Sequence, residues 1–515
     1  MALPAKDAPV LLRLDGITKR FGALTANDGV YLDLRQGEIL ALLGENGAGK
    51  TTLMNILFGH YVADEGSVLV SRDGGELAQL EPGSPHAALD AGIGMVHQHF
   101  TLAENLSVLD NILLGTEKLS ALKSARAPAR RKLADLMTRS GLTVGLDMRV
   151  SQLSVGEKQR VEILKALYRN ARVLVLDEPT AVLTPQESDT LFAILKKLAA
   201  AGLGIVFISH KLAEVMAASH RIAVLRGGAK VADLPTSQCD QRQLAELMVG
   251  HEVSETVRGA GAPGDTLFVL TGVSAGESRE SIRDVNLELR SGEILGIAGV
   301  SGNGQTMLAR VISGLETPVA GSMRLGDRAL THANARTMID AGLARIPEDR
   351  HRDGIVGAMT VSENLAIEAI RKPESQRFGL LRFAAMRDKA KAMIDAYDIR
   401  CQGEDSPARL LSGGNIQKIV LARTLEGEPK VVLAAQPSRG LDVGATSEVY
   451  RRLLDARARG AGVLLISEDL DELMRLSDRI AVIHRGHLSA AEPTETLDRG
   501  TLGLRMAGHT MEAAE

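Results

Sequence analysis

Short apolar runs of strand length alternate along the chain with longer stretches of helical character. Val173–Leu176 and Gly204–Ile208 are dominated by Val, Ile, Leu and Phe, which favours buried strands. Between these two runs, Glu187–Ala200 has the length and composition of a helix. Strands that alternate with helices predict an α/β fold, in which a mainly parallel sheet carries helices on both faces.

The second half of the chain repeats the first. DLRQGEILALLGENGAGKTTL, which starts at Asp33, recurs as ELRSGEILGIAGVSGNGQTML from Glu288, and Gly44 corresponds to Gly299 at an offset of 255 residues. LSVGEKQ, which starts at Leu153, recurs as LSGGNIQ at an offset of 258 residues. So steady an offset indicates two copies of one domain, because solenoid repeats have periods of about 20–50 residues.

A polar, Gly-containing segment separates the two copies. Residues 251–266, HEVSETVRGAGAPGDT, lack helical or strand periodicity and are predicted to form a linker. We therefore expect cassette 1 at residues 8–250 and cassette 2 at residues 267–508, with a tail at residues 509–515.

Composition narrows the class of protein. The 60 Lys and Arg residues stand against 64 Asp and Glu residues, for a net charge of -4, which gives no basic footprint for nucleic acid. The only two cysteines, Cys239 and Cys401, fit a reducing compartment. No signal peptide and no apolar run of the roughly 18–20 residues needed to cross a bilayer is recognisable, so we expect a protein that works from the water side.

A glycine-rich phosphate-binding loop (the P-loop) follows the strand-like run Ile39–Leu43. Its glycines let backbone N–H groups curl around phosphates, and the N-terminus of the helix that follows adds partial positive charge. Lys50 is expected to reach the terminal phosphates, and the Thr51 hydroxyl to ligate Mg²⁺. The predicted nucleotide-binding residues of this segment are Gly44, Glu45, Asn46, Gly47, Ala48, Gly49, Lys50, Thr51 and Thr52.

Two carboxylates and a histidine stand at the ends of later strands. Asp177 and Glu178 directly follow an apolar strand, at the edge where ligands bind in open α/β sheets. Asp177 is expected to hold Mg²⁺ through water, and Glu178 to orient and deprotonate the attacking water. His210 ends the next apolar strand, where its spacing from Asp177 suits a contact to the γ-phosphate.

The order of these motifs resembles that of ABC ATPases over nearly the whole chain, twice. LSVGE from Leu153 is similar to the ABC signature, and Gln98 in MVHQHF is similar to the Q-loop glutamine. The resemblance implies ATP and Mg²⁺ as cofactors, with Gln98 contacting both, and an antiparallel β part and a helical subdomain near residues 100–150. It also implies that Phe21 stacks on adenine, although a core phenylalanine at a strand end fits the local sequence equally well.

The second copy keeps the glycines of the P-loop but lacks the side chains that are predicted to bind phosphate and metal and to catalyse hydrolysis. Neutral Gln305 stands at the position that corresponds to the P-loop cation Lys50, and Ala435 and Gln436 stand in place of the two carboxylates. Glu468 takes the place of the histidine, and Glu348 that of the Q-loop glutamine. Since each positioned catalytic group contributes about 10²-fold or more, we predict that this copy hydrolyses no ATP.

The second copy nevertheless retains a better signature sequence. In ABC ATPases the signature of one cassette closes over the ATP of the other, so the resemblance implies that Lys50, Glu178 and His210 catalyse, while the second signature binds the γ-phosphate. The residues of that signature are Ser412, Gly413, Gly414 and Asn415.

Two cassettes in one chain, with a decayed second site, resemble the ATP-binding subunits of bacterial simple-sugar importers. HQHF at 97–100, PEDRHRDG at 347–354 and AAQPSRGLDVGA at 434–445 point to the purine-nucleoside branch. This resemblance implies two transmembrane permease subunits, an extracytoplasmic solute-binding protein, and a peripheral location on the cytoplasmic face of the inner membrane.

Two alternatives remain open on the sequence alone. The cargo could be a simple sugar such as ribose or galactose, because none of the motifs would touch it. A tandem-cassette translation factor would share the two-copy layout, but such proteins typically carry a long charged linker and two competent sites.

Overall fold

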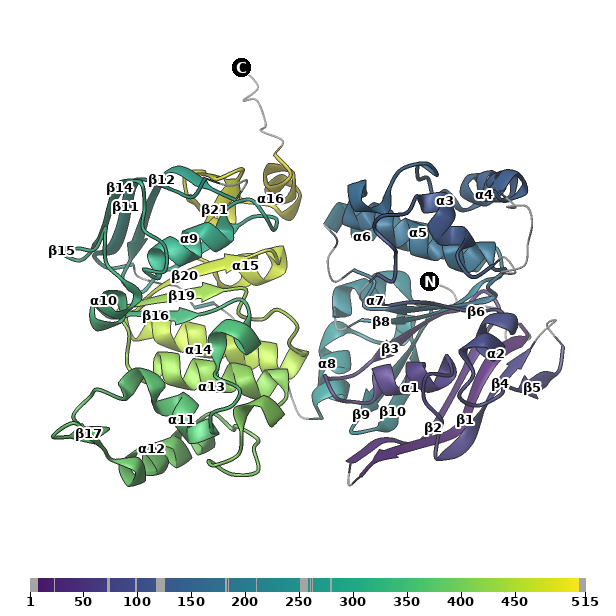
Figure 1. Cartoon of the computed structure of the whole chain (residues 1–515), viewed down its shortest axis with the longest axis horizontal. Helices are drawn as coiled ribbons and strands as arrows, with labels where there is room; N and C mark the ends of the chain where they lie inside the picture. The colour runs from purple at the N-terminus through teal and green to yellow at the C-terminus, as the bar shows by residue number, and fades with distance from the viewer. Residues whose placement is uncertain are drawn as a thin grey trace, which may run out of the picture. The chain divides into compact units, whose positions relative to one another are not determined.

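The computed structural model divides into two compact units, residues Met1–Val253 and Ser254–Glu515. It describes residues 8–22, 24–71, 75–97, 100–116, 126–180, 183, 185–209, 211–250, 258–259, 261, 263–277 and 280–508. The first unit contains cassette 1 (residues 8–250) and the second contains cassette 2 (residues 267–508) (Figure 1).

Cassette 1 contains a mainly parallel sheet and a separate antiparallel sheet. The parallel sheet has the order β10-β9-β3-β8-β7-β6, and only the edge strand β10 runs antiparallel to its neighbour. The second sheet, β2-β1-β4-β5, is antiparallel throughout. The strands are β1 Val10–Phe21, β2 Leu24–Arg35, β3 Ile39–Leu43, β4 Glu65–Ser71, β5 Leu77–Gln79, β6 Ile93–Val96, β7 Val173–Asp177, β8 Gly204–Ile208, β9 Arg221–Arg226 and β10 Ala229–Pro235.

Helices cover this sheet and form a helical layer after β6. The predicted helix at Glu187–Ala200 is α6, which begins two residues earlier, and the predicted helical subdomain contains α3 and α4. The helices are α1 Lys50–Leu57, α2 Pro85–Asp90, α3 Val108–Leu113, α4 Arg126–Ser140, α5 Val155–Tyr168, α6 Pro185–Ala200, α7 Leu212–Ala218 and α8 Gln241–Val249.

The two larger sheets of cassette 2 repeat this plan, and β17 and β18 form a further two-stranded sheet. The largest sheet, β16-β19-β20-β13-β21-β22 with β23 on β21, matches the order in cassette 1, and β12-β11-β14-β15 forms the antiparallel sheet. The strands are β11 Thr266–Ala275, β12 Ile282–Arg290, β13 Ile294–Ala298, β14 Ala320–Leu325, β15 Arg328–Ala329, β16 Leu343–Ile346, β17 Gln376–Arg377, β18 Leu380–Leu381, β19 Val431–Ala435, β20 Gly462–Ser467, β21 Arg479–His484, β22 His487–Leu488 and β23 Glu492–Pro493. The α/β fold predicted from the sequence is therefore confirmed, including the antiparallel part.

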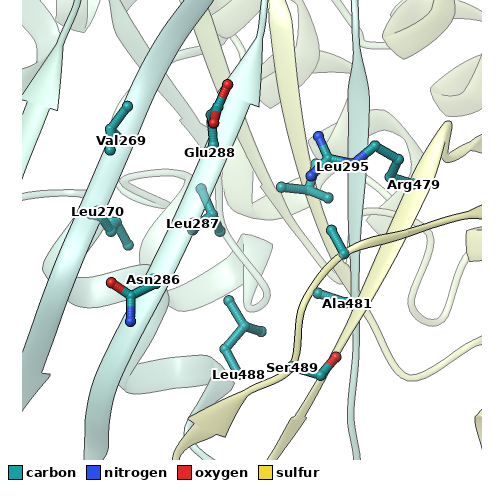
Figure 2. Close-up of a pocket in the computed structure, with 11 residues that line it drawn as sticks. Val269, Leu270, Asn286, Leu287, Glu288, Leu295, Arg479, Ala481, Leu488 and Ser489 are labelled. Atoms are coloured by element: carbon teal, nitrogen blue, oxygen red, sulfur yellow. The ribbon is translucent and has the colours of Figure 1, made fainter.

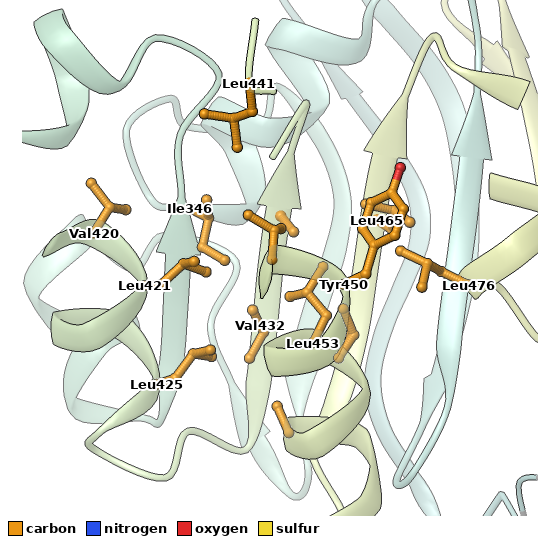
Figure 3. Packing of buried hydrophobic residues seen from close by; sticks show 14 of the residues in the cluster. Ile346, Val420, Leu421, Leu425, Val432, Leu441, Tyr450, Leu453, Leu465 and Leu476 are labelled. Atoms are coloured by element: carbon orange, nitrogen blue, oxygen red, sulfur yellow. The ribbon is translucent and has the colours of Figure 1, made fainter. Parts of the chain in front are cut away.

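The helices of cassette 2 pack on both faces of its larger sheet, as Figure 3 shows for one face. There, Val420, Leu421 and Leu425 of α13 and Leu453 of α14 are buried against strand residues such as Val432. The helices are α9 Gln305–Ile312, α10 Ala335–Asp340, α11 Val361–Ala366, α12 Phe383–Ala396, α13 Gly413–Leu425, α14 Val443–Ala458, α15 Leu470–Leu476 and α16 Arg499–Met506. The packing of helices on the sheets holds the ends of the strands, which carry the candidate site residues, in place.

Candidate nucleotide-binding sites

The P-loop of cassette 1 connects β3 to α1 and requires its glycines. Gly44 and Gly49 adopt φ angles of 154° and 96°, which residues with side chains rarely adopt. A Cβ atom on Gly44 would lie 2.4 Å from the Leu225 carbonyl oxygen, and one on Gly49 2.1 Å from that of Ala26. The loop is thus packed so closely against the body of the cassette that only glycine fits at these two positions.

Lys50 is held inside the loop that it follows. Its side chain is buried, and its Nζ donates to the carbonyl oxygens of Gly44 at 2.7 Å and Glu45 at 2.9 Å. Thr51, the next residue of α1, is exposed, and Thr52 is half-buried. This arrangement places one ammonium group within the loop and one accessible hydroxyl at the helix start.

The two carboxylates lie at the carboxyl end of β7. Burial, together with the neighbouring charge of Glu178, raises the pKa of Asp177, and Lys50 partly offsets that rise. Glu178 has a φ of 46°, and its backbone N–H donates to the Ile208 carbonyl oxygen at 3.0 Å. Two adjacent acids at a half-buried strand end repel one another, so a bound cation would stabilise their ionised forms. The site therefore fits a divalent metal ion.

A residue that the sequence did not single out connects the two segments that are predicted to be catalytic. Glu214 of α7 accepts a hydrogen bond from the Thr180 hydroxyl at 2.5 Å, and the Ser209 hydroxyl lies at 3.4 Å from the same oxygen. Thr180 follows the carboxylate pair and Ser209 precedes the predicted switch position. His210 and Gln98 themselves lie outside the described residues. The signal for Glu214 was present in the repeat, because Glu472 occupies the equivalent position in cassette 2.

Phe21 ends β1 and is accessible rather than part of the core. Its side chain is 45% exposed, and its ring meets that of Tyr61 edge-on at a centroid distance of 5.7 Å. Lys19 Nζ lies 5.5 Å from the ring centroid. The alternative of a buried core phenylalanine is therefore wrong, and the ring offers a surface for stacking.

The corresponding site of cassette 2 keeps the backbone but not the charges. Gly304 has a φ of 107°, and Gln436 a φ of 47°, close to those of Gly49 and Glu178. Gln305 is buried in the lysine position, and its Nε2 has no hydrogen-bond partner among the described residues. The fold of the site has been retained while its cation and its two carboxylates are missing.

One acidic side chain, Glu468, lies close to the second P-loop. The backbone N–H of Ser301, in the loop that corresponds to the phosphate-binding loop of cassette 1, lowers the pKa of Glu468 in part. Burial and the nearby charge of Glu348 raise the pKa of Glu468, and Arg439, which is ion-paired with Glu348, opposes the rise. A phosphate group entering here would meet two carboxylates and only one guanidinium.

The two signature segments differ in how their serines are used. In cassette 1, the Ser154 hydroxyl accepts from the Glu157 N–H at 3.3 Å, in a capping box that closes the first turn of α5. In cassette 2, the Ser412 side chain makes no such cap to α13 and accepts instead from Asn415 Nδ2 at 2.9 Å. The N–H groups at the start of α13, around Gly413 and Gly414, are thus left without a side-chain cap.

A cavity of about 310 Å³ in cassette 2 is separate from these segments (Figure 2). It is lined by β11, β12, β13, β21 and β22, and includes neither the P-loop nor the signature. Its two charged side chains already have partners, since Glu288 accepts from Thr266 at 2.6 Å and Arg479 pairs with Glu293 at 2.9 Å. We assign no ligand to it.

The chain matches one protein-family model twice. The model described as "ABC transporter" matches residues 27–181 and 282–439, more than half of the chain and once in each cassette. The chain belongs to the ABC transporter family. Within the described residues, none of its helices has both the length and the apolar character needed to span a bilayer.

Curated members of the ABC transporter family match along almost the entire chain. The nucleoside import ATP-binding protein NupA of Lactococcus lactis is 43% identical over 97% of this chain and 98% of its own length. The guanosine import ATP-binding protein NupO of Bacillus subtilis is 42% identical, over 98% of both chains. The glucose import ATP-binding protein TsgD13 of Haloferax volcanii is 43% identical, over 96% of both.

A solved structure of an archaeal ribosome recycling factor, in complex with the ribosomal stalk protein aP1, has the same tandem fold. The TM-score is 0.62, over 93% of this chain and 90% of the other, at 21% identity. At this identity the likeness concerns the fold alone.

Proposed function

We propose that this chain is the ATP-hydrolysing subunit of an importer for nucleosides. Cassette 1, residues 8–250, hydrolyses ATP, and cassette 2, residues 267–508, does not. This difference in activity is inferred from a comparison of the two equivalent sites. Cassette 1 has Lys50 and the Asp177–Glu178 pair, whereas cassette 2 has Gln305 and Gln436. The import activity and the nucleoside cargo are supported by the two relatives with nucleoside or guanosine in their names.

The residues of cassette 1 have distinct parts in the proposed reaction. The N–H groups of the P-loop and the Lys50 ammonium hold the phosphates, and Phe21 stacks on the base. Thr51, Asp177 and Gln98 would hold Mg²⁺, which supplies charge stabilisation for the phosphates. Glu178 orients the attacking water and accepts its proton, and His210 contacts the γ-phosphate.

The signature of cassette 2 completes the reaction in this proposal. Uncapped N–H groups and the hydroxyl of Ser412 would stabilise the charge that develops on the γ-phosphate. The difference between Ser412 and Ser154 supports this division of labour. Two transmembrane permease subunits, together with an extracytoplasmic solute-binding protein, would carry the nucleoside itself.

ATPase measurements on the purified chain test the catalytic half of the proposal. Glu178→Gln should lower turnover by about 100-fold or more, because it removes a general base. Gln436→Asn changes the equivalent position of cassette 2 and keeps a residue that tolerates a positive φ, so it should leave turnover unchanged. A Glu178→Gln variant with substantial turnover would contradict the proposal.

Uptake measurements test the cargo. Cells that lack this chain should lose uptake of labelled guanosine, and wild-type uptake should be blocked by excess unlabelled nucleoside but not by glucose or ribose. The reverse competition pattern would favour a sugar importer, for which the glucose relative is the specific support. Co-purification with ribosomal proteins and no membrane protein would instead favour the translation-factor alternative.

A further inference from the structure

The helical layer of cassette 2 carries an exposed β-hairpin that the ATPase site does not use. We call residues 371–383, RKPESQRFGLLRF, the hairpin segment. Its strands β17 and β18 pair Arg377 with Leu380 and Gln376 with Leu381, so Phe378 and Gly379 form a two-residue turn. Figure 1 shows β17 at the outer end of the layer formed by α11 and α12.

The turn residue Phe378 is unfavourable for the stability of the fold in two respects, its backbone conformation and its exposure to solvent. It adopts a φ of 53°, a conformation that Asn, Asp and Gly favour in such turns and that strains a bulky side chain. Its ring is 92% exposed, and the apolar neighbours Leu380 and Phe383 are 74% and 59% exposed. A strained backbone and exposed apolar side chains at the tip of one hairpin indicate a surface that binds a partner.

Cations surround the apolar tip. The hairpin segment contains Arg371, Lys372, Arg377 and Arg382, all exposed, against one acid, Glu374. Lys389 of α12 already pairs with Glu374 at 3.4 Å, and no described carboxylate lies within ion-pair distance of the three arginines. The Arg377 guanidinium lies 5.3 Å from the centroid of the Phe378 ring.

We propose that the hairpin segment docks cassette 2 on an anionic phospholipid surface. Phe378 and Leu380 would enter the boundary between headgroups and acyl chains, while the arginines pair with lipid phosphates. The charge favours lipid over protein, because a protein partner would have to supply several carboxylates around one apolar pocket, whereas an anionic bilayer presents phosphates on every side. The docking is independent of the ATPase site.

Vesicle sedimentation with the full chain tests this docking. The wild-type protein should bind vesicles of equal parts phosphatidylcholine and phosphatidylglycerol better than pure phosphatidylcholine, and NaCl should weaken the binding. Phe378→Asn, which suits the turn and should preserve the fold, is expected to weaken binding by about tenfold. Arg377→Gln/Arg382→Gln should weaken it by about 25-fold, at about fivefold for each cation.

Matched variants on other surfaces control for bulk apolarity and charge. Val319→Ser removes an apolar side chain that is 75% exposed, and Arg328→Gln/Arg459→Gln removes two exposed cations. Both should bind vesicles like the wild type, and every variant should retain ATPase activity. Equal binding by all variants would overturn the proposal. So would a Phe378→Asn protein that binds vesicles normally but no longer co-purifies with membrane proteins, since the hairpin would then bind protein.

Discussion

Replacing Glu472 by glutamine is expected to stabilise cassette 2 at neutral and alkaline pH but not at acidic pH. The side chain is fully buried at the start of α15, and burial raises the pKa of its carboxyl from 4.5 to about 7. Hydroxyl groups of Ser467, Ser438 and Tyr450 face it and lower that pKa in part, yet neither carboxyl oxygen has a hydrogen bond of normal geometry among the described residues.

The direction of the pH dependence of stability follows from the number of protons bound in the folded and unfolded states. Between pH 4.5 and about 7 the folded chain holds a proton on Glu472 that the unfolded chain has lost, so stability falls as the pH rises through this window and is level above it. Since each pKa unit corresponds to about 1.4 kcal/mol, the ionised carboxylate costs the fold about 3 kcal/mol. Glutamine has a similar shape and no charge to bury.

The assay compares the wild type and Glu472→Gln at about pH 5 and about pH 8. At the higher pH the variant should resist urea better, and its melting temperature should rise by about 8 °C. Slower hydrogen exchange in β20 and α15 would assign the gain to cassette 2.

Glu214→Gln in cassette 1 is the matched control for this comparison. Lys211 lies 3.3 Å from the Glu214 carboxylate and compensates its charge, so this variant should be less stable than the wild type at both pH values. Equal stability of Glu472→Gln and the wild type at about pH 8 would refute the argument that Glu472 is held there at an electrostatic cost.

Three further changes test the proposed catalytic site. Ser412→Ala should lower ATP turnover by about 100-fold, the usual effect of removing one donor to a developing negative charge, whereas Ser154→Ala should leave it nearly unchanged; equal effects would argue against the division of labour. Glu214→Gln should lower kcat by about 10- to 100-fold with little change in KM, because it loosens the contacts to Thr180. Phe21→Ala should raise the KM for ATP by about tenfold at unchanged kcat, and an unchanged KM would remove Phe21 from the base-stacking role.

The sequence was sufficient wherever a local pattern determines the backbone. The apolar run Ile39–Leu43 predicted a strand, the glycine spacing of residues 44–49 a loop, and the residues after it a helix; β3 and α1 flank that loop in the structure. The repeat predicted two domains of one α/β plan, and the sheet orders agree strand for strand. These features depend on neighbours along the chain, or on comparing one half with the other.

Contacts between distant side chains could not be predicted in the same way. Glu214 is one of 64 acidic residues in the chain, and only the fold brings it to Thr180 and Ser209. The position of Glu468 was recognised as a lost histidine, but its closeness to the Ser301 backbone N–H depends on the ends of two strands meeting at one sheet edge. The exposure of Phe378 likewise follows from a turn whose residue pair is unusual.

The geometry of cassette 2 indicates that its backbone still has a task. Gln436 keeps the positive φ of Glu178, and Gly304 keeps that of Gly49, although neither position has a carboxylate or a lysine to place. A site with no remaining use could relax into less strained turns at no cost, since a residue such as Gln at positive φ stores about 1 kcal/mol or more. The strain is understandable if the strand ends of cassette 2 must hold the α13 signature segment in place, because the turn after Gln436 contacts that helix through the bond from Gln417 to the Pro437 carbonyl oxygen. The proposed division of labour would explain both observations, the lost catalytic groups and the retained backbone: cassette 1 would supply the catalytic groups, and cassette 2 a rigid support for the signature.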